Sequence, residues 1–567
     1  MLRGIPVSEG TGIGKAYVIR NTELKYEKKV VEDKQAEKER FHAAVEEYCR
    51  RTDMAADKLS ESAPKEADII RGHKIMIQDP FMISQIDDKI ENGICAEAAG
   101  EEVLDMFRGM FLAADDELTK QRATDVDDIK AGLLRILLGA KEQNLSDIPA
   151  ESIIITEDLT PSMTAALDKN NVCGIVTENG GRTSHSAILA RALGLPAVLS
   201  VPDAVSVMED GMTVIVDGSE GIVIAEPDKE TQQFYIEKQA AFAAEKKLLA
   251  DYAGRPTVTA DGKKKEVYCN IGNISDAVTA SEKSGEGIGL FRTEFLFMKS
   301  EHAPDEELQF ETYKKAAQLF KEGSVIIRTL DVGGDKNITY LGMQSEANPF
   351  LGFRAVRYCL ENKELFRTQL RAILRASAFG CIKIMVPLVT NVSEMRQVRQ
   401  LIDEIKCELE AEGTNFDRNI QLGAMIETPA ASMIADLLAK ECDFFSIGTN
   451  DLTQYTMAAD RGNPQVSYLN NVYEPAVLRF IRHIIKCAGE AGIPVGVCGE
   501  AAADPMMTPL LLAFGLDEFS VNPAYVLRTR YNISRWTQEE ADRIADVAMT
   551  FDTAEEIEKY LKMTIIK

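Results

Sequence analysis

The stretch LGAMIETPAASMIADLLAKECDFFSIGTND, residues 422–451, decides the fold of the longer part of this chain. Its two apolar runs, 422–426 and 444–447, have the length and composition of buried strands, and helix-like sequence lies between them. The same unit recurs between residue 255 and the C-terminal end, with further apolar runs at 267–270, 287–290, 325–328, 382–385, 494–497 and 518–521. Eight strand–helix units over roughly 310 residues predict a (β/α)8 TIM-type barrel, within the usual size of that fold.

Reactive side chains follow these predicted strands directly, at the end where (β/α)8 barrels carry their active sites. Arg292 and Arg328 offer planar forks for phosphate and carboxylate oxygens, and Arg461 after the sixth strand can add a third. Glu427 and Asp451 follow neighbouring strands and provide hard oxygen ligands of the kind that hold Mg²⁺ beside a substrate phosphate. A surface ion pair explains any one of these residues taken alone. Their joint placement favours a site for a small, multiply anionic substrate.

Cys498 follows the seventh predicted strand and precedes Gly499 and Glu500. A cysteine in this position is either a small buried hydrophobic residue or an acid–base group, and the residue pattern leaves both interpretations open. The chain has ten cysteines with no CxxC pair and no regular spacing, which argues against a zinc ribbon and a disulfide framework. We therefore expect reduced thiols and a cytoplasmic protein.

The segment GGRTSHSAILAR, residues 180–191, contains a second candidate site. Thr183 or Ser184 is a natural N-cap and Gly194 ends the predicted helix, so His185 falls in its first turn. At that end the helix dipole disfavours an imidazolium and favours an attached phosphate, which suits a neutral nucleophilic imidazole and its phosphorylated product. The alternative is a capping or surface histidine. The double glycine, the hydroxyl pair and the following arginine favour the reactive interpretation.

Ahead of the barrel, the sequence changes character several times. Short β-like pieces occupy residues 1–20, and strand–helix alternation resumes over 146–225. Between them, residues 21–145 carry long, charged, helix-periodic segments, so we predict a helical domain inserted into a discontinuous α/β domain. Residues 226–254 are rich in Lys, Glu and Ala and are interpreted as a helical linker to the barrel over 255–567.

Residues 10–15, GTGIGK, have the look of a phosphate-binding loop. They lack the spacing of the GxGxxG motif and of the Walker loop. We therefore interpret them as a β-turn segment with no role in binding a nucleotide.

The composition limits the classes of partner. Ninety acidic residues against 64 basic ones give a net charge of −26, which repels nucleic acid and anionic membranes and favours a basic protein partner. A share of 45% hydrophobic and 27% charged residues is ordinary for a globular protein. The N-terminal residues lack the apolar stretch of a signal peptide, and no run of about 18 apolar residues occurs. We expect a protein that is not inserted in a membrane.

Five stretches of the chain form long and specific motifs: residues 180–190, 287–298 (GIGLFRTEFLFM), 346–354 (EANPFLGFR), 371–380 (RAILRASAFG) and 444–455 (FFSIGTNDLTQY). They resemble those of the phosphoenolpyruvate-protein phosphotransferases, the Enzyme I family of the bacterial sugar phosphotransferase system. The resemblance covers essentially the whole chain. It implies a phosphohistidine swivel domain, interrupted by a helical domain that binds the phosphocarrier protein HPr. It further implies a barrel that binds phosphoenolpyruvate and forms a homodimer.

The resemblance also implies a role for each candidate residue. His185 would accept phosphate at Nε2 and pass it to HPr, as the first step of sugar uptake. Cys498 would protonate the enolate that becomes pyruvate. Phosphoenolpyruvate would be bound by Arg292, Arg328, Asn450, Asp451 and Arg461, and Mg²⁺ by Glu427 and Asp451.

Two rival functions fit parts of this pattern. Pyruvate phosphate dikinase and phosphoenolpyruvate synthase share the histidine-bearing helix and the barrel, but they carry a large ATP-binding domain. The first 150 residues of this chain are largely helical and leave no room for one. A non-catalytic sensor of phosphoenolpyruvate is the other rival, and the presence of every expected site residue argues against it.

Overall fold

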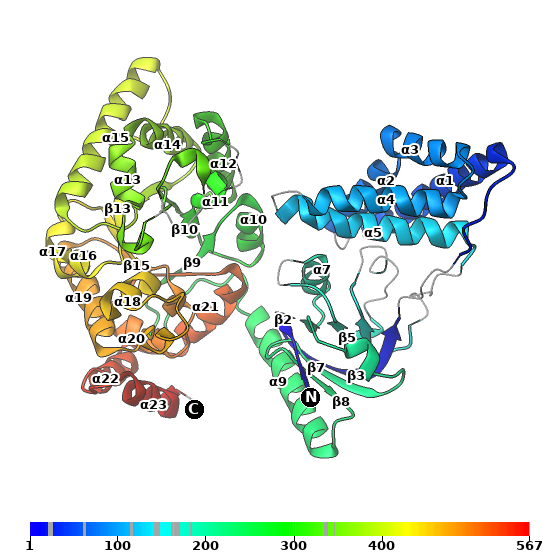
Figure 1. The fold of residues 1–567 in the computed structure, drawn as a ribbon. Helices are drawn as coiled ribbons and strands as arrows, with labels where there is room; N and C mark the ends of the chain where they lie inside the picture. Colours follow the sequence, from blue (N-terminus) through cyan, green and yellow to red (C-terminus); the bar gives the residue numbers. More distant parts are fainter. Residues whose placement is uncertain are drawn as a thin grey trace. The chain divides into compact units, whose positions relative to one another are not determined.

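The computed structural model divides the chain into two compact units, Met1–Lys246 and Lys247–Lys567 (Figure 1). Each unit is described by itself. None of the helices in the described part of the chain is long and apolar enough to cross a membrane. The structure describes residues 1–20, 26–59, 64–113, 117–140, 148–159, 163, 170–181, 184–298, 300, 302–333, 338–344 and 346–565.

The second unit is built on a closed barrel of eight parallel strands, which confirms the predicted (β/α)8 fold. The strands pair in chain order, and β16 closes the barrel by pairing with β9, with Val521 opposite Cys269. Nearly every strand residue is buried, which is why these strands appear as continuous apolar runs. The strands are β9 (Glu266–Ile271), β10 (Ile288–Arg292), β11 (Val325–Arg328), β12 (Ile382–Val386), β13 (Gln421–Ile426), β14 (Phe444–Ile447), β15 (Val495–Val497) and β16 (Glu518–Val521).

Helices cover the outside of this barrel (Figure 1). Most present one apolar face to the strands, as in α14, where Phe366, Leu370 and Ile373 are buried at helical spacing. The α-helices are α10 (Ile274–Glu282), α11 (Glu294–Met298), α12 (Glu306–Leu319), α13 (Ala355–Glu361), α14 (Lys363–Ala376), α15 (Val392–Glu412), α16 (Pro429–Met433), α17 (Ala435–Leu438), α18 (Thr449–Met457), α19 (Pro475–Ala491), α20 (Met507–Phe514), α21 (Val526–Ser534), α22 (Gln538–Ala548) and α23 (Ala554–Ile565). Short 3₁₀ helices are η2 (Thr339–Leu341), η3 (Pro349–Leu351), η4 (Ser377–Phe379), η5 (Ser467–Leu469), η6 (Glu500–Ala502) and η7 (Pro523–Tyr525).

The first unit contains an eight-stranded mixed sheet in the order β1-β8-β7-β3-β4-β5-β6-β2. Strands β3, β4, β5 and β6 run parallel, and the strands that flank them pair antiparallel. Two separate apolar clusters of described residues involve the strands of this sheet, and one of them includes Ala187 and Ala190 of α7. The elements are β1 (Leu2–Arg3), β2 (Ile5–Ser8), β3 (Thr11–Ile19), β4 (Ser152–Thr156), β5 (Val172–Thr177), α7 (His185–Leu193), β6 (Ala197–Leu199), α8 (Ala204–Val207), β7 (Thr213–Asp217), β8 (Ile222–Ala225) and α9 (Lys229–Ala250).

Among the described residues, five helices separate β3 from β4 along the chain, although the two strands are paired in the sheet, with Lys15 opposite Ser152. These helices bury a core of their own, in which Phe41, Ile86, Val103 and Ile129 are fully or almost fully inaccessible to solvent. The chain thus leaves the sheet after β3 and returns to it at β4. The helices are α1 (Lys34–Leu59), α2 (Pro64–Ile77), α3 (Pro80–Glu91), α4 (Ala96–Leu112) and α5 (Glu117–Leu137).

The GTGIGK segment is not the turn predicted from the sequence. Residues 11–15 lie in β3, a central strand of the sheet. A Cβ atom on Gly12 would lie 2.2 Å from the carbonyl oxygen of Cys173, and one on Gly14 would lie 2.2 Å from that of Glu151. These glycines therefore allow the neighbouring backbone to approach the strand closely. The segment shares the glycine-rich composition of a turn but not its structure.

Candidate active site

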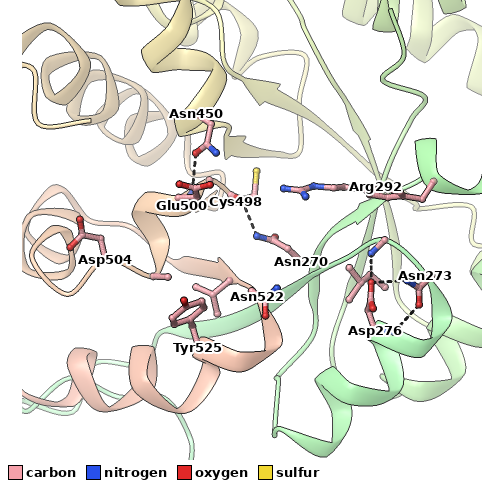
Figure 2. A pocket seen from close by; sticks show the side chains of 16 residues that line it. Asn270, Asn273, Asp276, Arg292, Asn450, Cys498, Glu500, Asp504, Asn522 and Tyr525 are labelled. Atoms are coloured by element: carbon pink, nitrogen blue, oxygen red, sulfur yellow. Dashed lines mark hydrogen bonds between the residues drawn. The ribbon is translucent and has the colours of Figure 1, made fainter. Parts of the chain in front are cut away.

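The site residues predicted within the barrel lie at the carboxyl ends of its strands. A cavity of about 730 Å³ opens there, and Arg292, Asn450 and Cys498 contribute to its wall. Figure 2 shows these three side chains converging from β10, from the start of α18 and from the end of β15. Asn270 of β9 and Glu500 of η6 complete this side of the wall. Closure of the barrel therefore brings together residues that are more than 200 positions apart.

Arg328 is buried between two carboxylates. Its guanidinium lies 2.6 Å from Glu294 and 2.8 Å from Asp331, and Asp331 also contacts Arg354 over 2.7 Å. Burial by itself would lower the pKa of Arg328, but attraction by Glu294 and Asp331 outweighs it and raises the pKa. The guanidinium thus stays charged and is held in one orientation.

Three members of this buried network were not assigned a role from the sequence: Glu294, Asp331 and Arg354. The signal for Glu294 and Asp331 was present, because each follows a barrel strand within three residues. Arg354 ends the 346–354 stretch and carries no such signal by itself. Its guanidinium lies 5.6 Å from the ring of Phe350, and its ion pair with Asp331 is buried.

Two further arginines are closer to solvent. Arg292 is half-buried and makes no ion pair with any residue that the structure describes, so its fork is available to an anion in the cavity. The Arg461 side chain is 39% exposed and lies 3.3 Å from Oδ1 of Asp451. Arg461 is therefore brought to the same end of the barrel, next to a predicted metal ligand.

Glu427 lies just beyond β13 and is 2% exposed. Its Oε1 atom accepts a hydrogen bond from the backbone N–H of Leu388 over 2.7 Å, while its buried Oε2 has no hydrogen-bond partner among the described residues. Burial, together with the negative charges of Asp451 and Asp331, raises the pKa of Glu427 well above its ordinary value. A cation beside this carboxylate would relieve both effects.

Glu427 and Asp451 fit a divalent metal ion of the hard class. The Oδ1 atom of Asp451 is also buried and has no hydrogen-bond partner among the described residues, although Arg461 lies 3.3 Å from it. In the described part of the chain, no three His, Cys, Asp or Glu side chains form a metal-binding cluster. Two carboxylates are nevertheless sufficient for Mg²⁺, which usually takes one or two of them and completes its shell with water and substrate phosphate.

Cys498 is both packed and in contact with the cavity. It is 3% exposed and belongs to an apolar cluster with Met425 and Phe444 inside the barrel. Its Sγ atom lies 3.6 Å from the carbonyl oxygen of Ile447. Burial raises the pKa of the Cys498 thiol to about 11, so the group keeps its proton at neutral pH. Such a thiol is suited to donating a proton and poorly suited to nucleophilic attack.

Helix α7 in the first unit begins at His185, as predicted. The Oγ atom of Ser184 caps it by accepting a hydrogen bond from the N–H of Ala187 over 3.3 Å, and Gly194 ends it with a φ of 67°. The hydroxyl of Ser186 donates to Asp158 over 2.6 Å, which ties the start of the helix to the loop after β4. Thr183 and the side chain of His185 lie outside the described residues.

Comparison with known proteins matches both units. The family of phosphoenolpyruvate-utilising enzymes matches through its PEP-binding domain over residues 246–538, its mobile domain over 148–221 and its N-terminal domain over 3–122. The phosphoenolpyruvate-protein phosphotransferases of Priestia megaterium, Bacillus subtilis and Listeria monocytogenes are each 44% identical to this chain, over 99% of both sequences. This chain belongs to the phosphoenolpyruvate-protein phosphotransferase family. Members of the family of phosphoenolpyruvate-utilising enzymes generally use a divalent metal ion.

Membership of the phosphotransferase family gives the two units different parts of one enzyme. The PEP-binding domain includes all eight strands of the barrel and every arginine discussed above. The mobile domain includes α7 and therefore His185.

Proposed function

We propose that this chain transfers the phosphoryl group of phosphoenolpyruvate to its own His185 and then to the histidine of HPr, releasing pyruvate. This reaction is the first step of sugar uptake by the phosphotransferase system. The observation that carries the proposal is the barrel mouth, the end of the barrel where the strands finish. Arg292 lines the cavity there and makes no ion pair with a described residue. A charged, preoriented Arg328 ends β11 on the same side, and the carboxylates of Glu427 and Asp451 follow the neighbouring strands β13 and β14. A small trianionic substrate matches this set of groups.

Arg292 and Arg328 would bind the phosphate and carboxylate oxygens of phosphoenolpyruvate, with Asn450, Asp451 and Arg461 at the other side of the mouth. Arg328 is held by Glu294 and Asp331, so it would need little rearrangement as charge develops on the transferring group. Glu427 and Asp451 would hold Mg²⁺, which when bound neutralises charge on the phosphoryl oxygens. Arg461 would then be shared between Asp451 and the substrate.

His185 would attack the phosphorus in line through Nε2. The N–P bond forms as the bond from phosphorus to the enol oxygen breaks, and the enolate of pyruvate leaves. Cys498 would then donate its thiol proton to the enolate carbon, and solvent would return a proton to the sulfur. The start of α7 favours a neutral imidazole before transfer and the phosphorylated ring after it.

The same proposal assigns a role to each part of the chain. Residues 1–20 and 146–225 form the swivel domain, 21–145 bind HPr, 226–254 link the units, and 255–567 bind phosphoenolpyruvate and form a homodimer in the cytoplasm. One histidine has to face first the barrel and then HPr, so the swivel domain moves as a rigid body. The acidic excess of the chain suits a basic HPr surface.

Incubation with labelled phosphoenolpyruvate, with and without HPr, tests the function. We expect label on His185 and release of pyruvate without ATP, followed by transfer of the label to HPr. Phosphate exchange that depends on ATP would instead indicate a dikinase or a phosphoenolpyruvate synthase. Binding of phosphoenolpyruvate without release of pyruvate would indicate a sensor.

A further inference from the structure

The inner face of α14 contains one residue that is not apolar. Gln369 is fully buried, in the same face as Phe366, Leu370 and Ile373. A buried amide without partners is costly, and an apolar residue of similar size would fill the same space. The position therefore requires an explanation in terms of what the amide binds.

The Gln369 amide joins the ends of two barrel strands. Its Oε1 atom accepts a hydrogen bond from the backbone N–H of Leu330 over 2.9 Å, just after β11. Its Nε2 atom donates to Oγ1 of Thr293 over 3.2 Å, just after β10, and to the hydroxyl of Tyr313 over 3.4 Å. The hydroxyl of Thr293 in turn donates to the carbonyl oxygen of Arg328 over 2.8 Å. Every polar group of the amide is thus used.

The two segments that Gln369 joins carry the anion-binding arginines. Thr293 stands directly after Arg292, and Leu330 stands two residues after Arg328. We propose that Gln369 is a positioning residue, which sets the spacing of Arg292 and Arg328 for phosphoenolpyruvate without touching it. This inference rests on the proposed function, because it assigns substrate binding to those two arginines.

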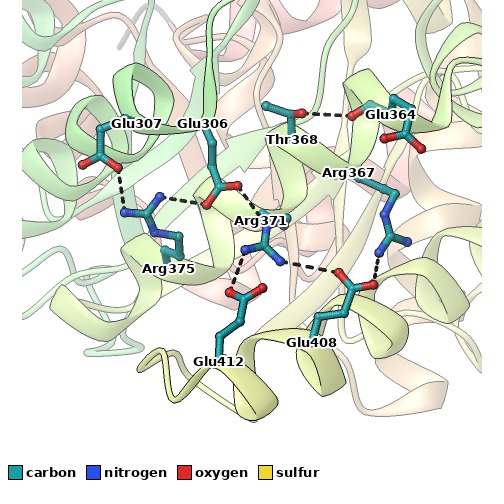
Figure 3. A network of polar contacts seen from close by, with 9 residues as sticks. All are labelled: Glu306, Glu307, Glu364, Arg367, Thr368, Arg371, Arg375, Glu408 and Glu412. Atoms are coloured by element: carbon teal, nitrogen blue, oxygen red, sulfur yellow. Dashed lines mark hydrogen bonds and ion pairs between the residues drawn. The ribbon is translucent and has the colours of Figure 1, made fainter.

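The outer face of α14 fixes the rotation of the helix, and therefore the direction in which Gln369 points. Figure 3 shows Arg371 and Arg375 of α14 paired with glutamates of the helices on both sides. Arg375 lies 2.7 Å from Glu306 of α12, and Arg371 lies 2.8 Å from Glu412 of α15. Residues two positions apart on a helix point in nearly opposite directions, so this network holds Arg371 outside while Gln369 faces the strands.

The ion-pair network of Arg371 and Arg375 also gives a role to residues 371–380. This stretch contains none of the residues assigned to the candidate active site. Arg375 lies 4.1 Å from the ring of Phe310 in α12, and its ion pairs with Glu306 and Glu307 anchor the same turn. A single exposed ion pair contributes little, whereas a set of paired arginines on one helix restricts its movement. The stretch thus stabilises the position of α14 between its neighbours.

The test compares two variants of Gln369 with a matched control in the full-length chain. Gln369→Met keeps the volume and removes every hydrogen bond, and we expect the KM for phosphoenolpyruvate to rise roughly 10- to 100-fold. Exchange of phosphate with phosphorylated HPr should stay unchanged, because it depends on the other unit. The control is Gln309→Met in α12. Gln309 is 1% exposed and hydrogen-bonds to Pro304 and to the hydroxyl of Tyr313, which it shares with Gln369. The control therefore alters that shared contact and leaves the hydrogen bonds from Gln369 to Thr293 and Leu330 in place.

In the Gln369→Glu variant we measure how the KM depends on pH, which a general loss of stability would not change in the same way. A protonated glutamic acid can accept from Leu330 and donate to Thr293, whereas the ionised form has no donor. We expect the ratio of its KM to that of the unmodified chain to fall as the pH is lowered from 8 to 6. This variant also keeps the inference testable if Gln369→Met fails to fold.

Melting temperatures of all variants show how far each one is destabilised. If Gln369→Met raises the KM no more than Gln309→Met does, and the Gln369→Glu ratio does not change with pH, Gln369 is only a packing residue and the inference is wrong. Arg292→Ala and Arg328→Ala are measured in the same assay. If neither changes the KM, the proposed role of the barrel mouth fails, whatever Gln369 does.

Discussion

The side-chain amide of Asn270 donates a hydrogen bond to the backbone carbonyl oxygen of Cys498 over 3.0 Å. The Oδ1 atom of Asn270 accepts from the hydroxyl of Ser520 over 2.7 Å, so the amide cannot rotate freely. The backbone N–H of Cys498 is held by the carbonyl of Ile447 on the other side. Strands β9, β14 and β16 therefore hold the backbone of Cys498, which carries the thiol at the cavity wall (Figure 2).

Substitution Cys498→Ala should lower kcat strongly and change the affinity for phosphoenolpyruvate little, because a proton donor acts on the enolate and not on the bound ester. Steady-state kinetics and direct binding of phosphoenolpyruvate separate the two quantities. Cys442→Ala is the matched control, since Cys442 is also a buried thiol but does not line the cavity. Weakened binding with unchanged turnover would make Cys498 a packing residue.

Alkylation as a function of pH tests the state of the same thiol. The pKa of Cys498 is raised to about 11, so the unreactive protonated form persists at pH 8 and the thiolate appears only as the pH approaches 11. We expect the exposed Cys381 and Cys407 to be labelled first by iodoacetamide at pH 8, as measured by peptide mass spectrometry. Rapid labelling of Cys498 at that pH would show that it is a thiolate.

Replacement of the acceptor, His185→Ala, should abolish phosphorylation by phosphoenolpyruvate and by phosphorylated HPr. Affinity for phosphoenolpyruvate should be nearly intact, because the binding arginines belong to the other unit. The measurements are label incorporation and calorimetric binding. His302→Ala, at an exposed position, is the control and should retain full activity. If the His185→Ala variant still incorporates label, the assignment of His185 as the phosphate acceptor is wrong.

The metal ligands are tested by Glu427→Gln and Asp451→Asn, which keep the shape of each side chain and remove its charge. Loss of a residue that only hydrogen-bonds to a metal ligand typically lowers the metal affinity 10- to 100-fold. Each of these changes removes a direct ligand, so we expect the metal affinity to fall by more than that. Activity is measured across a Mg²⁺ titration and after chelation. Glu441→Gln is the control, since Glu441 pairs with Arg396 on the surface. Activity that does not respond to a chelator would contradict this assignment.

Separation of the two units tests the assignment of domains. The first unit ends at Lys246 and the second begins at Lys247, so we place the cut between these two residues. Tyr252 belongs with the second unit, because its carbonyl accepts a hydrogen bond from Arg530 of α21. The predicted linker extended to residue 254, beyond the end of α9 at Ala250. The fragment 1–246 should fold alone and exchange phosphate with phosphorylated HPr, but take none from phosphoenolpyruvate.

The complementary fragment, 247–567, should bind phosphoenolpyruvate with Mg²⁺ and dimerise. Circular dichroism, phosphate exchange and sedimentation measure these properties. Phosphorylation of the fragment 1–246 by phosphoenolpyruvate alone would show that the assignment of the substrate site to the barrel unit is wrong.

Local sequence was sufficient where one segment carries its own signal. The apolar runs 325–328, 444–447 and 518–521 coincide with β11, β14 and β16, because a parallel strand buried on both faces needs apolar residues throughout. The start of α7 was predictable because Ser184 satisfies a free backbone N–H and Gly194 adopts the left-handed conformation. Both features depend on neighbours within a few residues.

The tertiary structure decided what depends on distant segments. Nothing near Gln369 in the sequence shows that its amide reaches Thr293, 76 positions away, or that Asp331 is shared by Arg328 and Arg354. GTGIGK was misinterpreted for the same reason, since Gly12 lies against the backbone of Cys173 in β5 and Gly14 against that of Glu151, just before β4. Closure of the barrel and pairing within the sheet create these contacts, and a side chain is oriented by the partners that folding brings to it.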